Sequence, residues 1–189
     1  LGPENGFIKG GSSENIAMEY GLKFHVDWLK GQKTGFFVDQ RENRHLLERY
    51  AKGRNVLNMF CYTGGFSFYA MRGGANLVHS VDSSAKAIDL TNMNVELNFP
   101  GDTRHKAYAE DAFDPPAFAK HKDALRNALR GYTKLNAKAF EKIKPGGILF
   151  TFSCSQVVDK VNFRNAVFTA AAQSGRSVRI LHQLTQPGD

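Results

Sequence analysis

The stretch NVLNMFCYTGGFSFYAM, residues 55–71, decides the fold of this chain. Its first six residues, Asn55 to Phe60, are a short apolar run typical of a buried strand. A Gly-Gly turn follows, and a helix is expected from about Phe66 to Met71. The order strand, glycine turn and helix opens a βα unit.

The same unit recurs along the chain, which defines the fold class. The next elements are a strand over 77–81 with Asp82 at its end, a helix capped by Ser83 or Ser84 that runs to about Leu97, and a strand around 107–108 that ends at Asp111. Repeated βα units with crossovers imply a parallel sheet with helices on both faces. We therefore predict an α/β protein with a Rossmann-like, doubly wound, mostly parallel sheet.

Further elements flank this series. We expect a helix over 42–52, a long helix over 122–142, a strand over 148–152, a helix over 159–173 and a final strand over 177–184. The long helix has an apolar seam made of Leu125, Leu129, Tyr132, Leu135 and Phe140. All of these elements belong to one expected Rossmann-like domain, residues 42–189.

The N-terminal part differs in composition. Residues 1–19 are rich in Gly, Ser, Glu and Asn and are expected to be a linker or a frayed terminus. Residues 20–41 predict a β-hairpin extension with strands over 20–28 and 34–38 and a turn at 30–32.

One junction breaks this pattern. Phe113 closes the segment after one strand, and Asp114 begins what should be the loop after another, with no crossover between them. A parallel neighbour needs a crossover of about a dozen residues or more. We therefore predict that a segment is missing between Phe113 and Asp114.

Composition limits the class of protein. The 189 residues are enough for a sizeable core, and charged residues interrupt every apolar stretch before it reaches the roughly 18 residues of a membrane span. Neither a secretory signal nor a disulfide framework is evident, so a cytoplasmic location is expected. The net charge of +7 favours a polyanionic partner such as nucleic acid.

The strand ends carry a candidate cofactor site. The glycines after Phe60 allow close backbone approach, and carboxylates at Asp82 and Asp111 can accept hydrogen bonds from ribose hydroxyls and an adenine amino group. The loop contains neither GxGxxG nor GxxxxGK[ST], which argues against a dinucleotide or a polyphosphate. An ordinary βα turn is the alternative, but the three positions together favour S-adenosylmethionine.

Two further segments could carry chemistry. Cys154, after the strand over 148–152, is either an inert buried thiol or a nucleophile with a lowered pKa at a helix start. Asp114-Pro115-Pro116 is either a rigid turn or a loop that presents polar groups to a flat heterocycle. Cys61 we interpret as a packing residue within the cofactor loop.

Basic residues recur every four positions along the long helix. They are Lys122, Arg126, Arg130, Lys134, Lys138 and Lys142. Like charges at this spacing repel each other slightly, and the series drifts around the helix by about 40° per step. A solvated helix surface and a surface that follows phosphates are about equally good interpretations.

Four motifs in this order resemble one known family. They are Gly31 to Arg41, Phe60 to Ser67, Asp114 to Lys120 and Ser153-Cys154-Ser155. Together they resemble the class I, S-adenosylmethionine-dependent 5-methylcytosine methyltransferases of large-subunit (23S) ribosomal RNA. The resemblance implies a bacterial cytoplasmic enzyme. Family members carry an N-terminal RNA-binding PUA domain and two further C-terminal strands, so we expect this chain to be truncated.

The resemblance also implies site residues. Cys154 would attack C6 of cytosine, and Asp114 would hydrogen bond to or protonate N3. No metal is expected. The expected cofactor contacts are Gln40, Arg41, Phe60, Cys61, Tyr62, Thr63, Gly64, Gly65, Asp82, Ser83, Asp111, Ala112 and Asp114.

Other functions remain open. The enzyme could methylate a guanine of ribosomal RNA without a cysteine nucleophile, or the chain could be an RNA-binding relative that has lost turnover. The expected partner in every case is large-subunit ribosomal RNA and not a membrane, and a homodimer is left open.

Overall fold

The computed structural model describes residues 9, 15–29, 31, 35–111, 122–153, 155 and 157–185. The chain divides into two compact units. The first consists of Leu1–Ala112 with Leu184–Asp189, and the second is Phe113–Gln183.

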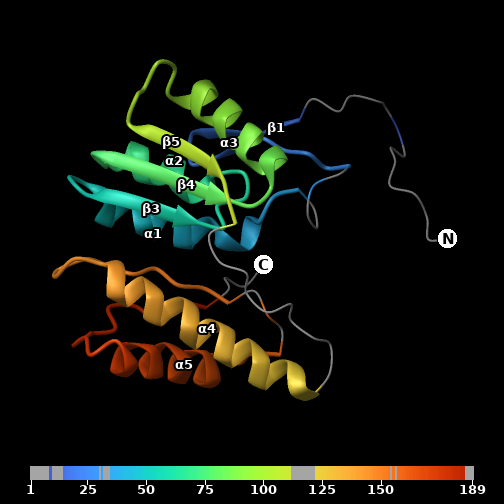
Figure 1. The fold of residues 1–189 in the computed structure, drawn as a ribbon. Coiled ribbons are helices and arrows are strands. Elements are labelled where there is room, and N and C mark those ends of the chain that lie inside the picture. Colours follow the sequence, from blue (N-terminus) through green and yellow to red (C-terminus); the bar gives the residue numbers. More distant parts are fainter. Residues whose placement is uncertain are drawn as a thin grey trace. The chain divides into compact units, whose positions relative to one another are not determined.

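A three-stranded parallel sheet organises the first unit. Its elements in chain order are α1 (Arg41–Ala51), β3 (Asn55–Met59), α2 (Gly65–Arg72), β4 (Leu77–Asp82), α3 (Ala85–Asn98) and β5 (His105–Ala109). The strand order is β3-β4-β5, with Met59 beside Val81 and Val81 beside Tyr108. The three arrowheads in Figure 1 therefore lie at one edge of the sheet. This confirms the predicted parallel α/β organisation.

The core of this unit forms where the sheet meets α2 and the N-terminal strands. Phe24, Phe68, Tyr69 and Val78 are fully buried and belong to one apolar cluster. The Phe24 and Phe68 rings lie 5.6 Å apart in a tilted arrangement. Burial of such large side chains contributes most of the stability of a core, about 1.5–3 kcal/mol each.

The β-hairpin lies earlier in the chain than predicted. β1 (Ile16–Glu19) pairs antiparallel with β2 (Leu22–His25) through a turn at Tyr20 and Gly21, both with positive φ. Two consecutive residues with positive φ are typical of a type I′ turn, whose twist matches that of the two strands of a hairpin. The prediction of a linker over 1–19 is therefore wrong at residues 16–19.

Side chains from α3 explain why β2 does not pair with the described residues 35–38. The Asn94 Oδ1 atom accepts a hydrogen bond from the His25 N–H at 2.6 Å. Asn98 bonds both the N–H and the carbonyl of Lys23, at 2.8 and 2.7 Å. These amides satisfy the second edge of β2, and Val38–Gln40 instead forms the short 3₁₀ helix η1.

The second unit is a helical pair, α4 (Lys122–Lys142) and α5 (Lys160–Gln173), which lie side by side in Figure 1. Tyr132 of α4 and Phe163 of α5 meet edge to face at 5.1 Å. Phe140 packs with Ala170 and Ala171. The predicted seam of α4 is thus confirmed at Tyr132 and Phe140, and both helices have the predicted bounds to within a residue.

The two strands predicted for this unit, over 148–152 and 177–184, are not formed in the described residues. A strand is stabilised by backbone hydrogen bonds to a neighbour and by burial of one face. Ile180 and Leu181 are each 58% exposed, so this apolar run has no covering layer. The junction at residues 113–114 lies outside the described residues.

Candidate functional site

The loop after β3, residues 60–65, has an unusual backbone. Phe60, Tyr62 and Gly64 all have positive φ angles, of 56°, 50° and 81°. For non-glycine residues this region costs roughly 1–2 kcal/mol each and persists only where the surroundings enforce it. Strain held in a loop at the carboxyl edge of a parallel sheet marks a functional segment.

Asp82, the last residue of β4, holds this loop. Its Oδ2 atom accepts a hydrogen bond from the Tyr62 N–H at 2.9 Å, and Oδ1 accepts one from the Ser84 N–H at 3.0 Å. A carboxylate has about four acceptor positions, so both oxygens retain capacity for ligand hydroxyls. Asp82 therefore both fixes the loop and presents acceptors beside it.

Two buried polar residues of α3 hold the loop from behind. Thr91 Oγ1 donates to the Tyr62 carbonyl at 3.0 Å, and Asn94 Nδ2 donates to the Thr63 carbonyl at 3.4 Å. Both side chains are fully buried. Sequence reasoning missed them, although two polar residues three positions apart on the inner face of an amphipathic helix were an available signal.

Gly64 allows the loop to pack closely. A Cβ atom at this position would lie 2.7 Å from Thr91 Cγ2 and 2.8 Å from Phe68 Cζ. Only glycine combines this close approach with the left-handed backbone. Glycine at position 64 is thus required by the packing of the loop against α3 and Phe68.

Cys61 points into the protein. It is 7% exposed, and its Sγ atom lies 4.0 Å from Thr91 Oγ1. Burial, reinforced by the negative charge of Asp82, raises the pKa of the Cys61 thiol to about 12. A thiol that remains protonated at neutral pH is a poor nucleophile, in agreement with the packing interpretation.

The other predicted contacts of the first unit lie around the same edge. Asp111 is exposed and follows β5 by two residues. Ser84, not Ser83, is the N-cap of α3, since its side chain accepts a hydrogen bond from the Ala87 N–H. Ser83 is exposed next to Asp82. Carboxylates at the end of β4 and just after β5, beside the loop that follows β3, are of the kind that accept hydrogen bonds from an adenosine group.

The segment before α1 contacts the loop through Tyr62. The ring of Phe37 meets that of Tyr62 edge to face at 5.3 Å, and the Tyr62 hydroxyl donates to the Gly35 carbonyl at 3.3 Å. Gln40 and Arg41 lie just beyond, where Gln40 accepts a hydrogen bond from Asn43 and Arg41 pairs with Glu42 at 3.1 Å.

Arg44 ties this segment to the hairpin. Its guanidinium forms a bidentate, buried ion pair with Glu19 at 2.7–2.8 Å and donates to the Phe37 carbonyl at 3.0 Å. A Cβ atom on Gly65 would lie 3.0 Å from Arg44 Cδ. Arg44 thus contacts both sides of the candidate site, a role that no sequence pattern indicated.

The two predicted catalytic residues, Cys154 and Asp114, lie outside the described residues, and so does Ala112. The described neighbours of Cys154 are held by hydrogen bonds: Ser153 Oγ donates to the Tyr132 hydroxyl at 2.9 Å and accepts from the Ser155 N–H at 3.3 Å.

The parallel sheet, with the strained loop after β3 and the carboxylate of Asp82 at the end of β4, defines a Rossmann-like α/β protein. The chain belongs to the S-adenosylmethionine-dependent methyltransferase family, whose profile matches residues 7–189. S-adenosylmethionine is the cofactor of this family. The carboxylate of Asp82 beside the loop is the kind of acceptor that the ribose hydroxyls of that molecule require.

Curated relatives support membership of the same family. The chain is 43% identical to the ribosomal RNA large subunit methyltransferase I of Tolumonas auensis and 41% identical to that of Aeromonas hydrophila. Each match covers 89% of this chain and 47% of the relative. The chain therefore spans about half the length of these curated relatives.

Solved structures share the fold. An S-adenosylmethionine-dependent methyltransferase from Streptococcus mutans superposes with a TM-score of 0.68 at 23% identity, over 88% of this chain and 48% of that one. Trm5b from Pyrococcus abyssi gives a TM-score of 0.66 at 19% identity, over 92% and 51%. The Rossmann-like methyltransferase fold predicted from the sequence is confirmed.

One match reveals a difference in length. The ribosomal RNA large subunit methyltransferase I of Shewanella denitrificans is 37% identical over 209 positions that include the whole of this chain. Because the chain has only 189 residues, at least 20 of those positions have no counterpart in it.

The described residues contain neither a membrane-spanning helix nor a metal cluster. Among the described residues, no helix combines the length and the apolar character needed to cross a bilayer. Within the same part of the chain, no three His, Cys, Asp or Glu side chains gather as a metal site.

Proposed function

We propose that the protein containing this chain methylates large-subunit ribosomal RNA with S-adenosylmethionine as donor. The observation that carries the proposal is the strained loop after β3, fixed by Asp82 beside the acceptors of a nucleoside site. Relatives about 40% identical, named for this activity, support the choice of substrate.

We further propose that the methylated atom is C5 of a cytosine. C5 is a weak nucleophile, so the ring must first be activated by addition of a nucleophile at C6. In this mechanism the Cys154 thiolate forms the S–C6 bond, and Asp114 donates a proton to N3 as negative charge develops there. Bound S-adenosylmethionine supplies an electrophilic methyl group. Removal of the C5 proton by water then allows the C6–S bond to break and the thiolate to leave, and N3 returns its proton to Asp114.

The hydrogen bonds around Cys154 support its assignment as the nucleophile. Ser153 and Ser155 are hydrogen bonded to each other, and Ser153 is bonded to Tyr132, a buried residue of α4. Fixed neighbours on both sides suit a residue that must attack a positioned base.

Substitution of Cys154 tests the cytosine mechanism. Cys154→Ala is expected to lower methyl transfer to 23S ribosomal RNA by at least about 10³-fold, because no other group would activate C6. Binding of S-adenosylmethionine, measured by calorimetry, should be unchanged. RNA that contains 5-fluorocytidine should form a persistent covalent complex with the wild-type chain only, since fluorine replaces the proton that must leave.

Other results would favour the alternatives. Full transfer by Cys154→Ala would support methylation of a guanine without a cysteine nucleophile. A wild-type chain that binds RNA but not S-adenosylmethionine would support a non-catalytic relative.

We also infer that the positions without a counterpart belong between Phe113 and Asp114. The shortfall of at least 20 positions is enough for one helix and one strand. Absence of that strand accounts for the unpaired stretches 148–152 and 177–184. Insertion of the corresponding segment of a relative should protect the backbone amides of 148–152 against hydrogen exchange. Unchanged exchange would contradict the inference.

A further inference from the structure

The positive charge of the protein is concentrated in one unit. Residues 122–185 carry eleven Lys or Arg and three Asp or Glu, a balance of +8, while the whole chain carries +7. The remainder of the chain is thus close to neutral. A local excess of this size is the electrostatic signature of a surface that meets a polyanion.

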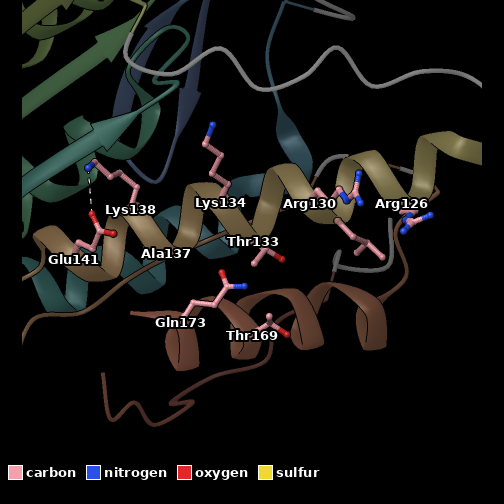
Figure 2. Close-up of a pocket in the computed structure, with 10 residues that line it drawn as sticks. Arg126, Arg130, Thr133, Lys134, Ala137, Lys138, Glu141, Thr169 and Gln173 are labelled. Atoms are coloured by element: carbon pink, nitrogen blue, oxygen red, sulfur yellow. Dashed lines mark hydrogen bonds and ion pairs between the residues drawn. The ribbon is translucent and has the colours of Figure 1, made fainter. Parts of the chain in front are cut away.

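Four of these basic residues form a row on α4, which we call the basic row: Arg126, Arg130, Lys134 and Lys138. All four side chains are exposed. At 1.5 Å per residue the row is about 18 Å long, and it turns by about 120° around the helix between its ends. Figure 2 shows the four side chains following one another along α4.

The basic row borders a groove between α4 and α5. The groove has a volume of about 760 Å³ and is also lined by Thr133 of α4 and by Thr169 and Gln173 of α5. Hydroxyl and amide groups such as these donate hydrogen bonds to phosphate and sugar oxygens. A groove of this volume can hold a ligand of several hundred Å³, which is about the volume of a nucleotide.

The row is arranged at a cost to the helix. Like charges four residues apart repel each other slightly. Glu141 is the acid that lines the groove, and it pairs with Lys138 at 3.2 Å while both side chains remain more than half exposed. An exposed pair contributes little and is readily exchanged for a phosphate contact.

We propose that the basic row and its groove bind the phosphate backbone of the RNA substrate. The inference rests on the proposed function, which supplies an RNA partner, and goes beyond it by naming a contact surface on α4. Arginine guanidinium groups bind phosphate in a bidentate manner, and the lysines add charge along the strand. The surface contacts phosphates and not bases, so it contributes affinity without sequence preference.

Matched double variants of the full chain test the proposal. R130Q/K134Q removes two charges from the row, and K160Q/R164Q removes two exposed charges from α5 outside the groove. Binding of a fluorescent single-stranded ribosomal RNA fragment is measured by anisotropy between 50 and 400 mM salt. Two lost phosphate contacts should lower affinity about tenfold or more near 0.1 M salt and reduce the slope of log K against log salt by about 1.4.

The control double variant should stay within about twofold of the wild type in both quantities. Calorimetric binding of S-adenosylmethionine should be equal in all three proteins, which shows that none has lost its fold. Equal losses in both double variants would overturn the proposal, because they would reflect net charge and not this surface. A wild-type chain that binds a poly-glutamate peptide but no RNA would overturn it in favour of an acidic protein partner.

These measurements distinguish a failure of the proposed RNA-binding surface from a failure of the proposed methyl transfer. Loss of RNA binding in R130Q/K134Q with no methyl transfer by any variant leaves the surface supported and the proposed reaction contradicted. Normal RNA binding by R130Q/K134Q together with methyl transfer contradicts the surface and supports the reaction.

Discussion

The carboxylate of Asp82 accepts a hydrogen bond from the backbone N–H of Tyr62 at 2.9 Å, across 20 residues of sequence. This contact joins the end of β4 to the loop after β3. It fixes a residue whose φ of 50° is unfavourable for a tyrosine. The geometry of the candidate cofactor site therefore depends on a neighbouring strand and not on the loop alone.

Replacement of this carboxylate should weaken cofactor binding. In Asp82→Asn one of the two carboxylate oxygens becomes an NH₂ group, which cannot accept a hydrogen bond. One of the two hydrogen bonds, from the Tyr62 N–H or from the Ser84 N–H, is therefore lost together with the negative charge. A hydrogen bond to a charged group contributes about 1.5–3 kcal/mol, so Kd for S-adenosylmethionine should rise at least tenfold by calorimetry. Asp89→Asn, an exposed change on α3, is the control and should bind as the wild type does.

Gly64 offers a test that separates steric clash from backbone strain. Gly64→Ala adds a Cβ atom within 3 Å of Thr91 and Phe68 at a φ of 81°. Gly53→Ala adds one at a φ of 70°, with nothing within 4 Å. Urea unfolding should show a loss of about 1–2 kcal/mol for Gly53→Ala and a further 1–3 kcal/mol for Gly64→Ala. Equal losses would mean that the loop can relax away from α3.

The buried ion pair between Arg44 and Glu19 should be costly to break from one side. The two side chains are 3% and 7% exposed, so Arg44→Met leaves an uncompensated carboxylate. The free energy of unfolding should fall by about 3–5 kcal/mol. The double variant with Glu19→Met should lose less than the sum of the two single changes.

An exposed pair provides the comparison for this cycle. Lys138 and Glu141 lie at a similar distance but are 59% and 53% exposed, so their coupling should be below about 1 kcal/mol. A similarly small coupling between Arg44 and Glu19 would contradict the assigned role of the buried pair.

His105 should make the first unit sensitive to mild acid. Its Nε2 atom lies 2.8 Å from Ser80 Oγ. Burial, assisted by the neighbouring His79, lowers the pKa of His105 to about 4. In the unfolded state His105 is therefore protonated below about pH 6.5, whereas in the folded state it stays neutral down to about pH 4.

The resulting stability is fully present above pH 6.5 and is lost as the pH falls from 6.5 toward 4. The loss should not exceed about 2 kcal/mol once solvent screening at this partly buried site is allowed for. Urea unfolding between pH 7.5 and 4.5 measures it, and His105→Gln should flatten the decline. A variant with the wild-type pH dependence would show that other groups cause it.

Much of the fold could be predicted because its signals are local. The Gly-Gly turn at 64–65, the cap at Ser84 and the apolar seam of α4 each act over a few residues, and each corresponding helix forms as predicted. The hairpin was misplaced because strand pairing depends on what satisfies the edge of β2. That partner is the pair of asparagines Asn94 and Asn98, some 70 residues away.

The candidate site likewise contains residues that the sequence predicts and residues that it does not. The residue types at the strand ends, at 60–65, Asp82 and Asp111, follow from the sequence, because parallel strands end at one edge of a sheet. The roles of Thr91, Asn94 and Arg44 do not. A buried polar side chain acquires its role from the partner that the fold brings to it.

The stretch at residues 55–71 by itself determined the βα order and the position of the candidate cofactor loop. Alternating periods and glycine turns are properties of neighbouring residues and can be read directly. Only the tertiary structure decided how that loop is held: by a carboxylate from β4, two polar side chains from α3 and an aromatic contact with Phe37. These contacts join residues distant in sequence, and their free energy is gained only once the sheet has formed.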